Sequence, residues 1–291
     1  AVLGLFASFY VILLMLEIWF MFRPYAVRQA QQRSGYIGKL WHVASLGSGD
    51  LSPKAMRYDE KWIFALAVIG IPSAHGLHGY VGFIFGSLKS REWWSSDLMP
   101  VVFLFSAIIS GVALLIVLYV LSCRLRRIPV DLECLKGLAY VLWGFAMFTL
   151  ALEGLEFANV VYKGREGIEM ILEYVTGPLL VPFFILQFSV GALLPLTMLT
   201  YMIWRGTTGK ALIVGVTVCG LLVLFQVWMM RWNVVIGGQE IAKTGKGLLG
   251  YQLVLFHREG LLTAISVAVA PLFLLWAAVR LLPPWEKAVT F

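Results

Sequence analysis

Four titratable residues stand inside segments that are otherwise apolar enough to cross a lipid bilayer: His75, His78, Glu153 and Glu156. A titratable side chain at membrane depth is costly, and residues of this kind commonly belong to proton relays or ligand sites. The members of each pair are three positions apart, so both lie on one face of a helix. We therefore interpret these four residues as candidates for catalytic, proton-coupled chemistry inside the membrane.

A second polar group lies in the segment RWNVVIGGQ, residues 231–239. Arg231, Asn233 and Gln239 carry hydrogen-bond donors that suit a carbonyl oxygen, and the Trp232 ring offers a flat apolar surface. A quinone takes up two electrons and two protons at its ring carbonyls, so donors, aromatic faces and titratable groups together predict a quinone-binding site. Histidine, which titrates near neutral pH, and carboxyl groups suit the proton transfers.

A proton path toward this site is a further hypothesis. Glu17 lies in the first apolar run, near the end that we place in the cytoplasm, and His75 lies near the middle of the second run. Their different depths suggest that protons could enter from the cytoplasmic side through Glu17 and His75. Such a path would make the protein electrogenic.

The composition indicates the class of protein. Hydrophobic residues make up 60% of the chain and charged residues 13%, whereas soluble domains carry about 25% charge. Runs of about 20 apolar residues span the hydrocarbon layer as helices. The sequence thus predicts an all-α, polytopic transmembrane helical bundle, a single integral-membrane domain over residues 1–291, with spans near residues 1–22, 62–87, 98–123, 136–159, 178–204, 210–230 and 260–282.

The segments outside these runs are short. The first run lacks a basic region before it and a small-residue cleavage site after it, so we interpret it as a helix and not as a signal peptide. The longest polar stretch, residues 23–61, is expected to form one ordered loop. If related proteins have more than seven spans, either an N-terminal portion is absent here or two helices are merged in one run, for example in the stretch 168–204.

The distribution of basic residues predicts the orientation. With seven spans, fifteen Lys and Arg residues fall on one side of the membrane and eight on the other. The positive-inside rule places the richer side, and with it the C-terminus, in the cytoplasm. The net charge of +7 is explained by this topology and by the anionic lipid headgroups that attract basic residues, so no nucleic acid partner is expected. We expect an inner (cytoplasmic) membrane location.

Metal centres are not expected in this chain. The cysteines Cys123, Cys134 and Cys219 show no C-x-x-C spacing, which argues against a structural zinc site or a four-thiolate iron–sulfur cluster. Of the four histidines, His42 and His257 lie in loops on opposite sides. His75 and His78 share one helix and cannot hold one haem iron from both axial sides.

The segments IPSAHGLHGY (71–80) and RWNVVIGGQ (231–239) resemble the NrfD/PsrC family of polysulfide reductase membrane subunits. The resemblance runs from MLEIWFMF (15–22) to the last apolar run. Within the family the chain is most similar to the membrane subunits of the Dsr complexes of sulfur- and sulfate-metabolising prokaryotes. Family members generally have eight or ten spans, and seven are visible here.

The resemblance implies a membrane subunit of a respiratory oxidoreductase complex that carries no haem or cluster itself and is not active alone. It would bind menaquinone or menaquinol near the outer face and exchange electrons with a docked ferredoxin-like iron–sulfur subunit, alongside other membrane and cytochrome subunits. The matching positions are His75, His78, Arg231, Asn233 and Gln239; Glu153 and Glu156 join them on the depth argument. The expected docking surface consists of the outer loops 89–97, 162–176 and 233–259.

Two other functions fit the same residues. A proton-coupled transporter would use the His and Glu side chains as a substrate site, but transporters usually show repeated halves with broken helices, and no repeat is visible here. A purely structural membrane anchor for a redox enzyme would leave the buried acids and histidines without a role. Quinone binding distinguishes the anchor from the quinone-reactive subunit.

Overall fold

The computed structural model describes residues 2–91, 93–163, 168–242, 247, 249, 254–256 and 260–282. Within these residues seven helical segments are long and apolar enough to cross a membrane, which confirms the expected all-α, multi-span fold. The spans are Val2–Gln32, Pro53–Gly86, Met99–Leu125, Leu132–Asn159, Leu180–Trp204, Gly209–Glu240 and Leu261–Leu281.

The chain divides into two compact units, residues 1–77 with 252–291 and residues 78–251. The division falls inside one continuous helix, α3 (Pro53–Gly86), between Leu77 and His78. Each unit is described by itself below. That the whole chain forms a single domain stays a prediction.

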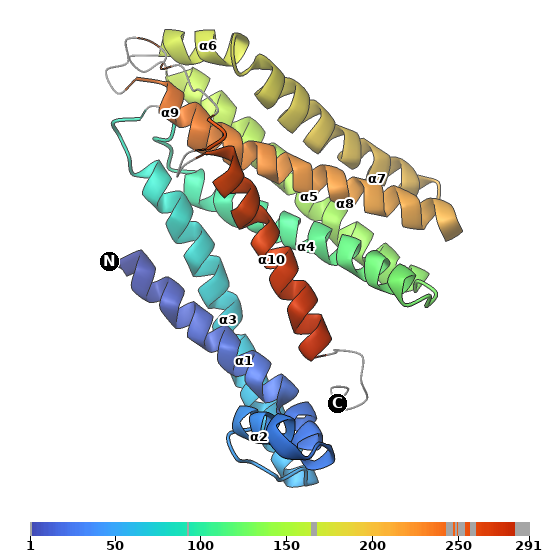
Figure 1. Cartoon of the computed structure of the whole chain (residues 1–291). Coiled ribbons are helices and arrows are strands. Elements are labelled where there is room, and N and C mark those ends of the chain that lie inside the picture. The colour runs from blue at the N-terminus through green and yellow to red at the C-terminus, as the bar shows by residue number, and fades with distance from the viewer. Residues whose placement is uncertain are drawn as a thin grey trace. The chain divides into compact units, whose positions relative to one another are not determined.

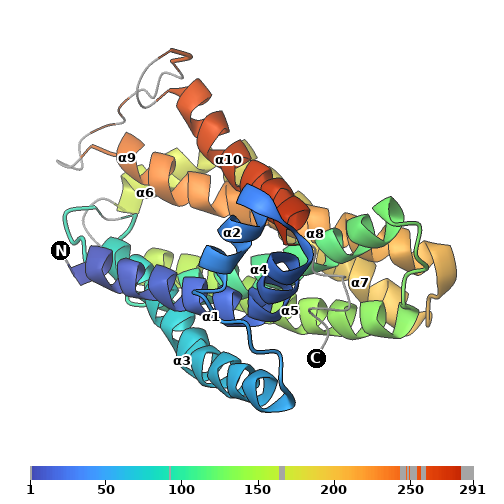
Figure 2. The same cartoon turned by 60° about the horizontal axis from the view of Figure 1, so that its bottom comes forward.

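The first unit contains α1 (Val2–Gln32), α2 (Gly35–Ala44), the first part of α3 and α10 (Leu261–Leu281). The short helix α2 packs against the C-terminal half of α1 (Figures 1 and 2). The Trp19 indole holds it there by donating to the carbonyl of Ala44 at 2.8 Å, and the rings of Tyr25 and Trp41 meet edge to face. The unit therefore has its best-packed region at the α2 end.

The expectation of a loop over residues 23–61 is wrong. Helix α1 continues to Gln32, α2 follows, and α3 begins at Pro53. Apolar runs mark where a chain meets lipid and not where its helix ends, so polar turns extend the helices beyond the runs. The start of α3 carries helix-initiation signals, because proline is tolerated in the first helical turn and the backbone N–H of Ala55 donates to the Ser52 hydroxyl at 3.3 Å.

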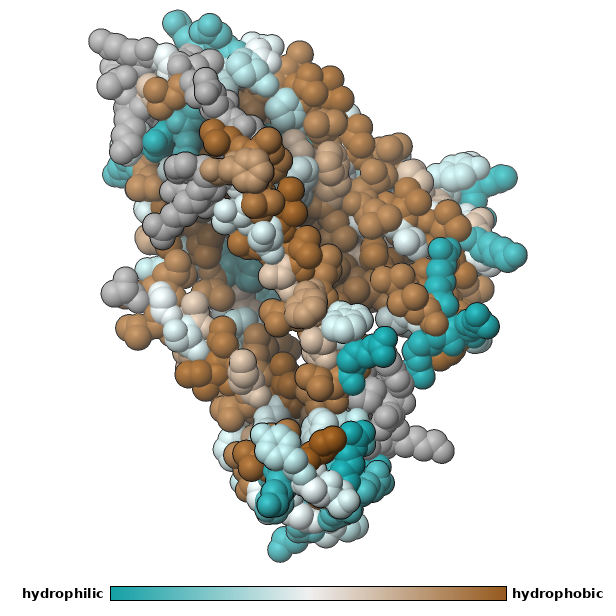
Figure 3. All heavy atoms as spheres, in the orientation of Figure 1, coloured by the Kyte–Doolittle hydropathy of each residue, from teal (hydrophilic) through white to brown (hydrophobic). Residues whose placement is uncertain are grey.

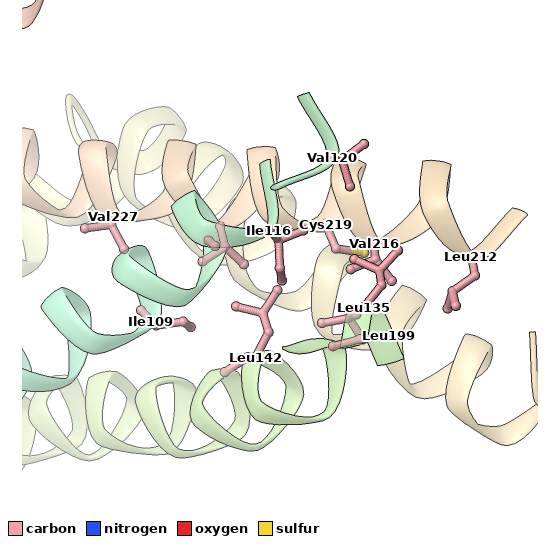
Figure 4. Close-up of a cluster of buried hydrophobic side chains, with 14 residues drawn as sticks. Ile109, Ile116, Val120, Leu135, Leu142, Leu199, Leu212, Val216, Cys219 and Val227 are labelled. Carbon is pink, nitrogen blue, oxygen red and sulfur yellow. The ribbon is translucent and has the colours of Figure 1, made fainter. Parts of the chain in front are cut away.

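The second unit is a bundle of α4 (Met99–Leu125), α5 (Leu132–Lys163), η1 (Leu180–Leu193) with α7 (Leu194–Trp204), and α8 (Gly209–Trp232). These helices run alongside one another in both views (Figures 1 and 2). Figure 4 shows their shared core, to which every helix except η1 contributes side chains. Its buried members include Ile116, Leu135, Leu142, Leu199, Val216 and Cys219.

Small residues let α4 and α8 approach each other. A Cβ atom on Gly220 of α8 would lie 3.2 Å from the carbonyl oxygen of Ala113 in α4, and both residues are buried. Lipid removes most of the hydrophobic drive for helix association, so close packing at small residues carries much of it. This contact fixes α8, which leads directly into the polar segment 231–239.

Two stretches have the wider π-helical hydrogen-bond pattern, η1 (Leu180–Leu193) and η2 (Asn233–Gly237). Isolated π turns inside helices often occur at functional sites. Segment η1 joins α7 in one span, so residues 180–204 hold a single membrane crossing and not two merged ones. Segment η2 continues α8 into the short helix α9 (Gly238–Glu240).

The surface agrees with a membrane setting. Hydrophobic side chains cover most of the visible sides of the helices, and hydrophilic side chains gather at helix ends (Figure 3). Helix α10 contains no buried residue among those described. Large apolar side chains such as Phe64, Phe273 and Leu274 are more than half exposed, as expected for residues that face lipid.

Candidate functional site

Glu153 is the acid at the centre of the second unit's polar interior. It lies on α5, and only 9% of its surface is exposed. Its Oε2 atom accepts a hydrogen bond from Nε2 of Gln187 at 3.1 Å, and its Oε1 atom accepts one from Nε2 of Gln226 at 2.6 Å. Each carboxyl oxygen therefore faces a neutral amide donor. No Lys or Arg among the described residues forms an ion pair with it.

The hydrogen bonds continue from Gln187 to Asn233. The Asn233 amide donates to Oε1 of Gln187 at 2.8 Å and to the carbonyl of Pro182 at 3.2 Å. Asn233 is 1% exposed. Its Oδ1 atom is buried and has no hydrogen-bond donor among the described residues. A chain of hydrogen bonds thus runs from the Asn233 amide through the Gln187 amide to the Glu153 carboxyl, and Asn233 Oδ1 is an open acceptor at its far end.

Four helical segments place these side chains, and both π-helical stretches are among them. Gln187 lies on η1, Asn233 begins η2, Gln226 lies on α8, and Glu153 lies on α5. The approach of η1 to α8 requires a glycine, because a Cβ on Gly191 would lie 2.5 Å from Cβ of Gln226 and 2.8 Å from its Cα. The bare backbone at this position lets the Gln226 amide reach Glu153.

A cavity of ≈ 70 Å³ lies beside the Glu153 carboxyl. Its polar lining consists of Glu153, Glu156 and Gln187, and the rest is apolar or aromatic. A water molecule needs about 10–15 Å³ of such volume, so the cavity accommodates a few waters as it stands. Its other walls come from Trp93, Met99, Val102, Phe157, Phe183, Met230 and Val234.

The turn after α3 is tied to the end of α8 beside this cavity. The Trp93 indole donates to the carbonyl of Asn233 at 3.2 Å, and the Trp94 indole donates to the carbonyl of Val234 at 2.5 Å. A Cβ on Gly238 would overlap the Trp94 ring. The glycine in the RWNVVIGGQ segment is therefore required for this close approach.

Arg91 strengthens the same connection. Its Nη1 atom donates to the carbonyls of Gly238 and Ile241, each at 2.8 Å, and its guanidinium lies 5.3 Å from the Trp94 ring centre. Carbonyls at a helix C-terminus lack intrahelical donors and carry partial negative charge. Arg91 satisfies them and holds α9 in place.

Arg231 faces α4 and does not line the cavity. Its Nη2 atom donates to the Ser106 hydroxyl at 2.8 Å, and its guanidinium lies 4.0 Å from the centre of the Phe103 ring. Phe103 packs with Met99 and Val102, which form part of the cavity wall. Arg231 is thus held by the Phe103 ring and the Ser106 hydroxyl, and it contacts the cavity wall only indirectly, through Phe103.

A separate hydrogen bond joins α9 to α6 (Ile168–Thr176), a helix within the stretch 162–176 that was expected to be a loop. The Tyr174 hydroxyl donates to the Glu240 carboxylate, and the Tyr174 side chain is 1% exposed. Burial, and secondly the hydrogen bond to Glu240, raises the pKa of Tyr174 above its ordinary value. Tyr174 therefore stays a neutral donor through the physiological range.

The structure brings some of the predicted site residues together. Glu153 and Glu156 line one cavity, and Asn233 reaches Glu153 through Gln187. Trp232 is half-buried one position before Asn233 and packs loosely against Trp228, with ring centres 6.2 Å apart. The functional roles of these residues stay predictions.

Other predicted residues lie elsewhere. His75 belongs to the first unit, is exposed, and places Nδ1 2.6 Å from the carbonyl oxygen of Ile71. The Glu17 carboxylate lies beside Gly70 of α3, which is five residues or about 7.5 Å along the helix axis from His75. His78 is half-buried in the second unit, and Gln239 is exposed on α9 and absent from the cavity lining.

The two residues that donate hydrogen bonds to Glu153, Gln187 and Gln226, were not predicted. They are only 3% and 2% exposed, inside apolar spans. A buried amide without a partner is costly, so a Gln inside a span carries the same signal as the His and Glu residues. Gln187 and Gln226 are neutral, so they are not among the titratable residues that were predicted to form the site.

The structure shows no group of three or more metal-ligating side chains among the residues it describes. Two of the cysteines, Cys123 and Cys219, are buried, and Cys134 is exposed. The expectation that His42 lies in a loop is wrong, because it belongs to the helix α2, and His257, also expected in a loop, lies outside the described residues.

Comparison with known proteins gives a consistent result. A family described as "Polysulphide reductase, NrfD" matches residues 1–242. One subunit of the selenate reductase of Mesobacillus selenatarsenatis is 32% identical over 239 residues, which cover 79% of this chain and 54% of that protein. The Hdr-like menaquinol oxidoreductase integral membrane subunit of Archaeoglobus fulgidus is 27% identical over 197 residues, which cover 66% of this chain and 48% of that protein.

A third relative is the membrane subunit of a putative dimethyl sulfoxide reductase of Halobacterium salinarum, 30% identical over 122 residues, which cover 38% of this chain and 28% of that protein. The chain thus spans about half the length, or less, of the curated relatives it matches. All three relatives are named as subunits of redox enzymes, and the names of the Halobacterium and Archaeoglobus proteins place them in the membrane.

Proposed function

Because the chain belongs to the NrfD family, we propose that it is the quinone-reactive membrane subunit of a respiratory oxidoreductase complex and that Glu153 exchanges protons with the quinone. The observation that supports this most is the Glu153 carboxyl, buried between two neutral amide donors beside a cavity with aromatic walls. A buried carboxyl without an ion-pair partner can gain a proton without leaving an opposite charge uncompensated, as a relay group must.

The donor set of this cavity fits a quinone headgroup. Trp93, Phe157 and Phe183 supply ring faces, and Glu153 and Glu156 supply exchangeable protons. Ligand pockets commonly measure about 300–1,000 Å³, far more than the ≈ 70 Å³ found here. Side chains such as Phe183 and Met230 must therefore move aside to admit the ring, and the cavity serves as the inner end of the binding site.

A quinone, when bound, supplies two-electron, two-proton redox chemistry. The chain's own contribution is proton handling. The Gln187 and Gln226 amides donate to the Glu153 carboxylate and stabilise its negative charge. Because both amides are neutral, protonation of Glu153 leaves no positive charge without a partner. Glu156 lies one helical turn further along α5 and lines the same cavity, so it provides a second exchangeable proton.

The remaining predicted residues have supporting roles in this proposal. Asn233 orients Gln187, and Arg231 holds the Phe103 ring, which packs with the wall residues Met99 and Val102. His78, Trp232 and Gln239 are proposed to form the entrance to the headgroup site. A proton path from the cytoplasmic side through Glu17 and His75 remains part of the proposal, with the C-terminus in the cytoplasm and the inner membrane as location.

Electrons would come from or go to a docked iron–sulfur subunit, as the family resemblance implies. The loop 89–97 and the start of segment 233–259 are held together by Arg91, Trp93 and Trp94, which supports a preformed docking surface. The name of the Archaeoglobus relative includes menaquinol, which supports menaquinone as the cofactor. A sulfur-metabolising Dsr complex stays our prediction for the branch.

Quinone binding tests the proposal. A menaquinol analogue is titrated against the detergent-purified chain, the Glu153→Gln variant and a control, Glu133→Gln, which changes an exposed acid on the same helix. We expect stoichiometric binding that weakens at least about tenfold in Glu153→Gln, a difference of about 1.4 kcal/mol, and is unchanged in Glu133→Gln. Absence of binding to the unaltered chain would favour a purely structural anchor.

A further inference from the structure

The first unit contains a large hollow at the α2 end of its helices. Its volume is ≈ 820 Å³, and it is lined by the C-terminal half of α1, the connection 45–52 and the first turns of α3. Hydrophilic side chains gather at this end (Figure 3). None of the residues that line the cavity beside Glu153 lines this hollow.

An ion pair forms one wall of the hollow. Arg23 donates from Nε to Oδ1 of Asp59 at 2.9 Å and from Nη2 to Oδ2 at 2.5 Å. Its Nη1 atom donates to the Ser48 hydroxyl at 3.0 Å and to the carbonyl of Asp50 at 2.9 Å. Every nitrogen of the guanidinium is thus engaged, so Arg23 braces the wall and is not available to a ligand.

The same hollow carries cations that are not engaged in ion pairs. Lys54, Arg57, Tyr58 and Lys61 all line it, and their spacing places them on one face of α3. The three basic side chains are exposed, and no carboxylate among the described residues pairs with them. Three cations from one helix face therefore offer their donors to one space.

The charge balance of the hollow is positive. Four cationic side chains and two carboxylates, Asp50 and Asp59, line it, which gives a net charge of +2. The backbone N–H of Ser52 donates to the Asp50 carboxylate at 2.7 Å and lowers the pKa of Asp50, so the count holds at neutral pH. An anion is the complementary ligand.

Apolar surface adjoins the cations. Trp19, Phe20 and Tyr58 also line the hollow, and the rings of Phe20 and Trp62 stack with centres 5.9 Å apart. Further along α3, Phe64 and Val68 are 72% and 54% exposed. Aromatic residues at the ends of spans mark the membrane–water interface. The site therefore offers donors for an anionic head and apolar helix faces for the chains attached to it.

We propose that this hollow binds the phosphate headgroup of an anionic membrane lipid. A phosphate diester accepts hydrogen bonds from several donors at once, and basic pockets between membrane helices recognise such headgroups. The lipid is favoured over free phosphate because the cations and the apolar helix faces adjoin. The Arg23–Asp59 pair holds α1 against α3 and so keeps the site open.

The test is native mass spectrometry of the full chain with added phosphatidylglycerol or, as a neutral lipid, phosphatidylcholine. The triple variant Lys54→Gln/Arg57→Gln/Lys61→Gln is compared with a control that removes three exposed cations elsewhere, Arg124→Gln/Arg205→Gln/Lys210→Gln. We expect one phosphatidylglycerol per chain to be lost at least tenfold more readily from the first variant than from the control. The proposal would be overturned if both variants lost phosphatidylglycerol equally, or if the unaltered chain retained phosphatidylcholine as well as it retains phosphatidylglycerol.

A second measurement separates lipid from free phosphate and does not depend on the triple variant. Phosphatidylglycerol with brominated acyl chains should quench tryptophan fluorescence, and part of that quenching should disappear in Trp19→Phe. Millimolar inorganic phosphate should not restore the fluorescence. Full restoration by phosphate would show a site for the free anion and contradict a lipid site, as would quenching that is unchanged in Trp19→Phe.

Discussion

The two units bury a carboxylate in opposite ways. In the first unit Asp59 meets the Arg23 guanidinium in a bidentate ion pair, and both side chains are at most 5% exposed. In the second unit Glu153 meets only the neutral amides of Gln187 and Gln226. Removing the charge of Asp59 would leave the buried Arg23 guanidinium without its counter-charge, whereas neutralising Glu153 leaves no opposite charge uncompensated. The comparison separates a bracing acid from an acid suited to proton transfer.

The largest expected effect concerns Glu153. In Glu153→Gln the new amide places a donor against the donor of Gln187 or Gln226 and carries no exchangeable acid proton. We expect quinol-linked electron transfer by the assembled complex to fall by about 10²–10⁴-fold, the usual contribution of a positioned acid or base. Turnover of Glu133→Gln should match the unaltered chain. Normal turnover in Glu153→Gln with an intact complex would remove Glu153 from the mechanism.

Asp59→Asn should instead affect stability. It leaves the buried Arg23 guanidinium without its counter-charge, which typically costs about 3–5 kcal/mol. Thermal unfolding in detergent measures the effect, with the exposed neighbour Glu60→Gln as control. The double change Arg23→Met/Asp59→Met should recover part of the loss. A melting temperature of Asp59→Asn equal to that of Glu60→Gln would contradict the bracing role.

Gly191→Ala tests the close packing of η1 and α8 that places the Gln226 amide against Glu153. The added Cβ would lie 2.5 Å from Cβ of Gln226, so η1 and α8 must separate. We expect a loss of about 1–3 kcal/mol in stability and slower quinol-linked electron transfer, because the Gln226 amide moves away from Glu153. Gly144→Ala on α5 is the control, since its Cβ would meet nothing within 4 Å. Identical behaviour of the two variants would show that this packing is looser than described.

Tyr174 shows a third way to bury a carboxylate contact, through a neutral hydroxyl, and only stability is expected to change when it is removed. Tyr174→Phe removes the donor to Glu240 and should cost about 1.5–3 kcal/mol, the range for a hydrogen bond to a charged group. Thermal unfolding at neutral pH measures the loss, and Tyr162→Phe, which changes an exposed tyrosine, is the control. Equal melting temperatures of the two variants would show that the Tyr174 hydrogen bond adds nothing to stability.

The pH dependence of unfolding tests the same residue. The folded pKa of Tyr174 lies above the ordinary value of 10.0, so its contribution to stability is fully present below that value. The contribution is lost progressively as the pH rises toward the folded pKa. Unfolding measured between about pH 8 and pH 11 should therefore show a steeper decline for the unaltered chain than for Tyr174→Phe. Parallel curves would mean that Tyr174 titrates alike in the folded and unfolded chain.

Composition and hydropathy were sufficient to predict the membrane class and all seven spans, because lipid imposes a length and polarity requirement that each segment meets by itself. The motifs 71–80 and 231–239 were sufficient for the family. Helix ends were predicted less well, as the polar turns before Trp62 in α3 show, since helical hydrogen bonding continues past the apolar run.

Only the tertiary structure decided the partners of the buried acids. Glu153 meets residues 34 and 73 positions away, and Arg23 meets Asp59 over 36 positions. Such pairs depend on the rotation and register of neighbouring helices, which in the second unit the two π-helical segments and Gly191 set through packing. Hydropathy reports which side chains are costly in lipid, but the choice of partner follows from where the helices touch.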